Sequence, residues 1–140
     1  MYEYKTHEAD IGILVKAPTL EEAFCDGARA MFGVMVEISS LRPERRVPVR
    51  ASGNDIPSLF VNFLNELLSQ KDIEDFFFGD FEVKRLWDEQ GVFWIEAEAI
   101  GEPLDPKRHE LRTEVKAATF HGIRYEHTTE GYILQCVLDV

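Results

Sequence analysis

The sequence predicts an α+β fold: a two-layer sandwich in which two helices cover one face of a mostly antiparallel sheet. Two observations support this class. The first half of the chain contains two segments whose apolar residues recur at helical spacing, and the second half contains alternating segments joined by short turns. Strands joined by short connections pair antiparallel, and the apolar face of such a sheet needs a covering layer. We expect a single domain over residues 1–140.

The first half alternates strand and helix. Thr19 to Glu22 form a capping box, in which the Thr hydroxyl accepts a hydrogen bond from a free backbone N–H at the start of a helix. Pro48 favours an edge position for its strand, because proline cannot donate to a neighbouring strand. In order, this half predicts a strand at 11–15, a helix from Thr19 to about Met35, a strand at 46–51 and a helix that opens at Asn54-Asp55.

The second half contains only strand patterns. The predicted strands lie at 75–87, 92–100, 113–119, 123–127 and 132–138. The last of them is apolar almost to the final residue, whereas chain ends are usually frayed and polar. We therefore expect this strand to lie inside the sheet, with its acidic end held in place.

Composition excludes several classes of function. The chain has a net charge of −11, which disfavours binding to a phosphate backbone and favours cations and basic protein surfaces. Cys25 and Cys136 are too few for a disulfide framework, so we expect buried free thiols of a reducing compartment. Neither an N-terminal signal pattern nor an apolar stretch near ~18 residues is present, so we expect a cytoplasmic protein without a membrane partner.

Carboxylates mark the ends of the first and last predicted strands. Asp10 comes just before the first strand, and Asp139 and the Val140 carboxylate come just after the last. If these strands are antiparallel neighbours, the three carboxylates meet at one end of the sheet. Calcium takes about 6–8 oxygen ligands at ~2.3–2.6 Å, so these groups and water could complete its shell. The alternative is that Asp10 is a turn residue and Asp139 belongs to a solvated tail.

Other candidate residues show weaker patterns. His7 could orient Asp10 or bind a metal, although a hydrogen-bonded structural role is the default for a histidine near a turn. Lys116 is expected in a cross-strand ion pair, with a functional role as the alternative. His109 and His121 show no metal-ligand spacing. The sequence contains no Gly-rich phosphate loop, nucleophile elbow or metalloprotease motif, so no catalytic residues can be assigned.

Taken together, the motifs resemble those of archeases in identity and order. The segments that carry the resemblance are His7-Glu8-Ala9-Asp10-Ile11-Gly12-Ile13, Thr19-Leu20-Glu21-Glu22-Ala23-Phe24, Leu64-Asn65-Glu66-Leu67-Leu68, Gly101-Glu102, His109, Glu114-Val115-Lys116-Ala117-Ala118-Thr119-Phe120-His121 and Leu138-Asp139-Val140. The block from Glu114 to Thr119, combined with the Asp-Val end, is the most specific. The chain departs from the family pattern at Glu8, where Thr is usual, and at Phe120, where Tyr is common. Glu8 adds an anion beside Asp10.

The resemblance implies a function. Archeases are small cytoplasmic cofactors of the RtcB-type RNA ligase, which joins tRNA halves using GTP and a manganese centre. They promote guanylylation of the ligase, allow multiple turnover and can broaden its nucleotide choice. Family members hold a metal, assigned as calcium, at the positions of Asp10, Asp139 and Val140. The resemblance thus implies a non-enzymatic partner of the ligase that needs no direct nucleic-acid contact, and it leaves the oligomeric state open.

Two other classes of function remain as alternatives. Clustered carboxylates with divalent ions can activate water, so the protein could be a metal-dependent phosphoester hydrolase. That class is weakened by the lack of an evident general base and of phosphate-binding groups. A chaperone-like interaction domain is the other alternative. It should expose an apolar patch and depend little on the carboxylates of Asp10, Asp139 and Val140.

Overall fold

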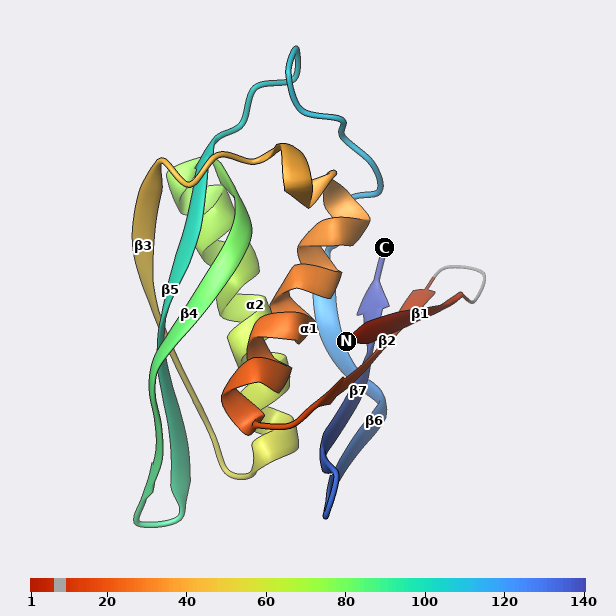
Figure 1. The fold of residues 1–140 in the computed structure, drawn as a ribbon, viewed down its shortest axis with the longest axis vertical. Coiled ribbons are helices and arrows are strands. Elements are labelled where there is room, and N and C mark those ends of the chain that lie inside the picture. Colours follow the sequence, from red (N-terminus) through yellow and green to blue (C-terminus); the bar gives the residue numbers. More distant parts are fainter. Residues whose placement is uncertain (7–9) are drawn as a thin grey trace.

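The computed structural model describes residues 1–6 and 10–140 (Figure 1). These residues form two α-helices, one short 3-10 helix and seven strands. In chain order the elements are β1 (Tyr2–Thr6), β2 (Asp10–Ala17), α1 (Leu20–Met35), η1 (Ile38–Ser40), β3 (Arg45–Gly53), α2 (Ile56–Glu74), β4 (Phe76–Glu89), β5 (Val92–Pro103), β6 (Ala117–Thr128) and β7 (Gly131–Asp139). All strand pairs that these elements form are antiparallel, which confirms the predicted α+β class.

The strands divide into two sheets, with the strand orders β1-β2-β7-β6 and β3-β5-β4. Both helices lie between the sheets, so each sheet has one face covered by helices (Figure 1). The chain passes from the first sheet to the second between β2 and β3, by way of α1, and it returns after β5 through the connection at 104–116. Alternation of apolar residues shows which face of a strand is buried, but it does not show which sheet the strand joins.

The helix starts match the capping signals. The Thr19 hydroxyl accepts a hydrogen bond from the Glu22 backbone N–H at 3.2 Å, and α1 begins at Leu20 as predicted. The Asp55 carboxylate accepts one from the Ser58 N–H at 2.7 Å and caps α2. Local side-chain chemistry therefore sets both boundaries.

The strand predictions hold in part. The edge position predicted from Pro48 is confirmed, because β3 lies at the edge of its sheet, and β7 is internal as expected. The first strand, β1, was not predicted; its Tyr4 hydroxyl donates to the Ala30 carbonyl of α1 at 2.8 Å. The two strands predicted at 113–119 and 123–127 are one strand, β6, whose register with β7 shifts between Thr119 and Arg124.

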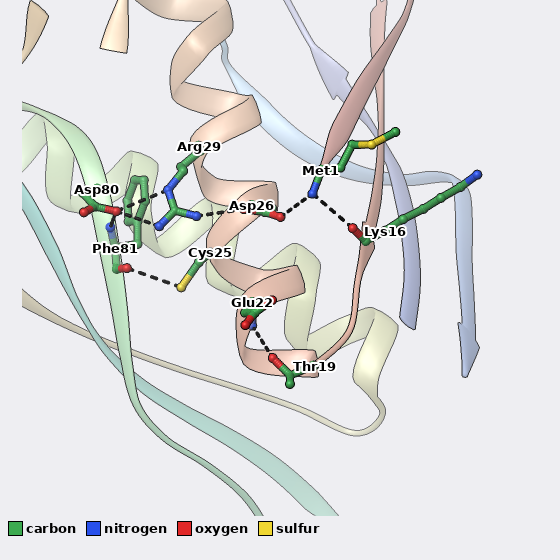
Figure 2. A network of polar contacts seen from close by, with 9 residues as sticks. All are labelled: Met1, Lys16, Thr19, Glu22, Cys25, Asp26, Arg29, Asp80 and Phe81. Carbon is green, nitrogen blue, oxygen red and sulfur yellow. Dashed lines mark hydrogen bonds and ion pairs between the residues drawn. The ribbon is translucent and has the colours of Figure 1, made fainter. Parts of the chain in front are cut away.

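A polar network ties α1 to both sheets (Figure 2). The Arg29 guanidinium donates to Asp26 at 2.8 Å and to Asp80 of β4 at 2.7 Å. Asp26 also accepts from the Met1 ammonium at 2.6 Å, which extends the network to the start of β1. Partial burial opposes ionisation of Asp80, but hydrogen bonds from Arg29 and the Phe81 N–H outweigh it and hold its pKa below the usual value.

Two further predictions concern the cysteines and the membrane. Cys25 and Cys136 are buried free thiols, as expected from the sequence. Burial raises the pKa of Cys136 to about 12, so its thiol is protonated at neutral pH. Within residues 1–6 and 10–140, no helix is long and apolar enough to cross a membrane.

Candidate metal centre

Asp10 and Asp139 lie opposite each other at the paired ends of β2 and β7. These strands are antiparallel, and their register pairs Asp10 with Asp139 and Ile11 with Leu138. The convergence predicted from sequence is therefore present. Directly opposed residues of an antiparallel pair have Cβ atoms about 4.5–5.5 Å apart and project from the same face.

The two carboxylates project from the sheet face that points away from the helices. Successive residues of a strand alternate between faces, and the neighbours Ile11 and Leu138 pack into the core between the sheets. Asp10 and Asp139 therefore lie on the opposite face, and both are half-buried. The Val140 side chain packs against the core, which holds the final residue beside the pair.

β6 is the third strand at this corner of the sheet, the end where Asp10 and Asp139 lie. Ala117 pairs with Asp139, and the Lys116 N–H donates to the Asp139 carbonyl at 2.8 Å. These contacts use only the main chain of Asp139. Among residues 1–6 and 10–140, neither the Asp10 nor the Asp139 carboxylate has a hydrogen-bond or ion-pair partner. At a separation of ~5 Å two such charges repel by ~1–3 kcal/mol, which a shared cation would relieve.

A side chain of α2 fixes the edge of the sheet at this corner. The Asn65 amide donates to the Ala118 carbonyl at 3.0 Å, and its oxygen accepts from the Ala118 N–H at 2.8 Å. Ala118 in turn pairs with Leu138, one residue from Asp139. The role of Asn65 was missed from the sequence, where it served only as part of a family motif. The available signal was an amide beside the apolar face of a helix, because a buried amide requires partners.

His109 belongs to a separate buried cluster. Its Nδ1 accepts from the Asp105 N–H at 3.0 Å, and its Nε2 lies 3.1 Å from a Glu102 oxygen without the alignment of a hydrogen bond. Glu102 is only 2% exposed and also accepts from the Arg42 N–H and the Arg108 guanidinium. Burial opposes ionisation of Glu102, but these donors and the Arg108 charge prevail and hold its pKa below the usual value. The cluster therefore holds the loop after β5.

The remaining candidates lie apart from the carboxylate pair or outside the description. Lys116 is exposed just before β6, and its ammonium has no salt-bridge partner in the described part of the chain. The cross-strand ion pair expected for it is not seen there. His121 is exposed on β6. His7 and Glu8 lie outside the described residues, so their predicted roles beside Asp10 stay predictions.

The donors at the corner suit a hard cation. They are carboxylate oxygens of Asp10 and Asp139 and main-chain oxygens of Val140, the ligand type that calcium and magnesium prefer. Within the described ranges, no three His, Cys, Asp or Glu side chains gather closely enough to hold a metal. Water would therefore supply a large part of the coordination shell at this corner.

Comparison with known proteins identifies the family. The family model described as "Archease protein family (MTH1598/TM1083)" matches residues 2–140. The chain belongs to the archease family. An archease from Pyrococcus abyssi is 42% identical and one from Pyrococcus furiosus 39% identical, each over 140 residues that cover 99% of this chain and 98% of the relative.

Solved structures agree with the archease assignment. The solution structure of Methanobacterium thermoautotrophicum protein 1598 is similar with a TM-score of 0.85, at 30% identity, and covers 99% of this chain and 98% of that chain. A Thermotoga maritima protein described as "an archease, possible chaperone" is similar with a TM-score of 0.60 over 100% of this chain and 98% of that chain. Its identity to this chain is 16%, so it supports the fold alone.

Proposed function

We propose that the protein is a non-enzymatic activator of an RtcB-type tRNA-splicing RNA ligase. It promotes guanylylation of the ligase with GTP, and thereby multiple turnover, through an acidic tip formed by Asp10, Asp139 and Val140. Membership of the archease family supports the class of function. The observation that supports a role for this tip is the pairing of Asp10 with Asp139 at the ends of β2 and β7.

The tip binds a divalent cation, for which calcium is the best candidate. A bound cation supplies positive charge that phosphate oxygens or a group of the ligase can share. Asp10 and Asp139 hold it through their carboxylates, and the Val140 main chain adds oxygens beside them. The β6 contacts to the Asp139 main chain keep that residue in place without using its side chain. The net charge of −11 favours approach to a basic surface around an active site.

A turnover experiment tests the proposal. Ligation by the ligase of the same organism is measured under single-turnover and multiple-turnover conditions, with and without this protein. We expect Asp139→Asn to abolish the stimulation of multiple turnover and to leave the circular dichroism spectrum unchanged. Asp72→Asn is the matched control, because the Asp72 side chain is 76% exposed near the end of α2 and forms its ion pair with the adjacent Lys71. Normal stimulation by Asp139→Asn would overturn the proposed role of the tip.

Two assays separate this proposal from its alternatives. The pure protein is incubated with nucleotide and phosphodiester substrates and divalent ions; turnover without any ligase would instead indicate a metal-dependent hydrolase. The Thermotoga maritima relative is described as a possible chaperone, which motivates the second assay. Suppression of client aggregation by Asp139→Asn as effective as that by the unaltered protein would support a chaperone-like function.

A further inference from the structure

A groove is lined by residues from the starts of both helices and from the β4–β5 and β6–β7 hairpins. Figure 1 shows where these elements lie. The volume of the groove is about 490 Å³, within the range of sites that bind small ligands or side chains. The apolar residues that line it include Leu20, Ile56, Leu86, Phe93, Tyr125 and Tyr132. Tyr132 is the second residue of β7, the strand that ends at Asp139, so the groove lies about 23 Å along β7 from the acidic tip.

The groove exists because the hairpins extend beyond the helices. The 14 residues of β4 span about 46 Å at a strand rise, whereas the 16 residues of α1 and the 19 residues of α2 span about 24 Å and 28 Å. The β4–β5 hairpin extends past the first residues of both helices (Figure 1). Beyond these helix starts, the space between the two sheets has no helix to fill it.

The walls of the groove continue the rows of core residues. Leu86 pairs with Ile95, and Phe93 lies two residues before it, so both project from the core face of β4 and β5. On the other sheet, Tyr125 pairs with Leu134, and Tyr132 lies two residues before it. Leu86, Phe93 and both tyrosines are half-buried, while Ile95 and Leu134 are fully buried.

The aromatic wall is ordered. The rings of Tyr125 and Tyr132 are stacked with centroids 6.4 Å apart and planes at 16°. The His127 ring stacks on Tyr132 at 4.1 Å and 11°. Stacked rings restrict each other's rotation, so little side-chain entropy is lost when a partner packs on them.

Carboxylates stand at the rim. Asp55 and Asp88 both line the groove. Hydrogen bonds from Ser58 lower the pKa of Asp55, which keeps it ionised at neutral pH. Asp88 is exposed and has no ion-pair partner among residues 1–6 and 10–140. Two arginines lie over the ring of Trp87, which also lines the groove: the Arg85 guanidinium is 4.0 Å and the Arg50 guanidinium 5.9 Å from the ring centre.

We infer that the groove binds a segment of a partner protein in which aliphatic or aromatic side chains are flanked by Lys or Arg. The apolar walls take the side chains, and the rim carboxylates take the cationic neighbours. A second copy of this chain is disfavoured because each copy carries a net charge of −11. Anionic lipids and nucleic acids are disfavoured by the same rim charges. The inference goes beyond the proposed function, because the groove is remote from the tip.

A peptide titration tests the inference on the full chain. The probe is the pentapeptide Lys-Leu-Lys-Phe-Arg, acetylated and amidated at its ends. One matched peptide replaces the basic residues by Glu, and another replaces Leu and Phe by Ser. We expect amide chemical shift changes confined to the groove and at least tenfold weaker binding of either matched peptide at low salt. Equal binding of the three peptides, or shift changes centred on the acidic tip, would overturn the inference.

Charge-reversed variants provide a second measurement. Asp88→Lys should weaken binding of the basic peptide at least tenfold. Glu44→Lys introduces the same charge change at an exposed residue next to the start of β3 and should leave peptide binding unchanged. Both variants should keep calcium binding at the tip, so a failure of the groove can be distinguished from a failure of the proposed function. Unchanged peptide binding by Asp88→Lys would exclude the site.

Discussion

Asn65 of α2 holds the backbone of Ala118 on β6 through two hydrogen bonds, at 2.8 and 3.0 Å. β6 is the edge strand of its sheet, so peptide groups that point away from β7 have no strand partner. The Asn65 amide offers one donor and one acceptor in the arrangement of a neighbouring strand. In this way α2 fixes the edge of the sheet beside Asp139.

Asn65→Asp should destabilise the fold and weaken the calcium binding proposed for the tip. The substitution keeps the acceptor for the Ala118 N–H but replaces the donor by a carboxylate oxygen that faces the carbonyl. The bond is part-buried, and leaving such a carbonyl without its donor costs about 1–3 kcal/mol at most in the free energy of unfolding. Urea denaturation measures this cost, and calorimetric calcium titration measures the effect on the tip.

Asn62→Asp is the matched control for this prediction. The Asn62 amide also donates to a backbone carbonyl, that of Ser52 at 2.8 Å, but this bond is exposed. We expect a smaller loss of stability and unchanged calcium affinity. Equal effects of the two substitutions on calcium affinity would show that Asn65 has no positioning role.

Asp139→Asn should have opposite effects on stability with and without calcium. In a chelator the substitution removes the repulsion between Asp10 and Asp139 and should raise the free energy of unfolding, by ~1–3 kcal/mol at most. With calcium in excess the unaltered protein gains stability by binding, whereas the variant gains much less. Chemical denaturation under the two conditions measures both effects. If calcium stabilises neither protein, or both equally, the pair does not hold the cation.

The predictable parts of this fold rest on local chemistry. The helix starts follow from the Thr19 and Asp55 caps, which satisfy backbone groups within the same few residues. The pairing of Asp10 with Asp139 follows from chain direction, because an antiparallel neighbour must bring the end of one strand to the start of the other. The first conclusion needs no knowledge of how distant surfaces pack, whereas the second depends on β2 and β7 being neighbours, which the sequence analysis had to assume.

The unpredicted parts depend on distant partners. The division into two sheets is decided by packing on opposite sides of the helices, which alternation within one strand does not encode. β1 is five residues long and has few apolar residues, so its pattern is weak without the Tyr4 bond to α1. The groove has the same origin, since the walls around Phe93 and Tyr132 read as ordinary core positions in the sequence. These side chains line an open groove only because the hairpins are longer than the helices.

Gly27→Ala should destabilise the helix pair. A Cβ at this position would lie 2.4 Å from the Phe60 ring, which is completely buried. Alanine raises helix propensity by up to about 1 kcal/mol, but overpacking a core typically costs about 1–3 kcal/mol, so a net loss is expected. Thermal unfolding followed by circular dichroism measures it.

Gly33→Ala is the matched control on the same helix. Its Cβ would approach the Tyr4 hydroxyl at 2.8 Å, so this exposed side chain must shift at the cost of its hydrogen bond to the Ala30 carbonyl. We expect a smaller loss of stability than for Gly27→Ala, because no buried ring is displaced. Phe60→Leu should partly restore the stability of Gly27→Ala by making room. A Gly27→Ala variant as stable as the unaltered protein would contradict the close packing of α1 on α2.

Glu102→Gln should reduce stability at neutral pH and have a smaller effect in acid. The folded-state pKa of Glu102 lies below its ordinary value, so the unfolded chain binds its proton more readily. Its ionic contribution is therefore complete well above pH ~4.3, the ordinary Glu value, and is lost as pH falls through the lowered pKa. We expect a cost of ~1–3 kcal/mol at pH 7, because Arg108 and the Arg42 N–H lose a charged acceptor.

Urea denaturation at pH 7 and pH 3 measures the difference, with Glu44→Gln as an exposed control that should change neither value. A cost that stays the same at both pH values would mean that the Glu102 charge does not hold the loop after β5.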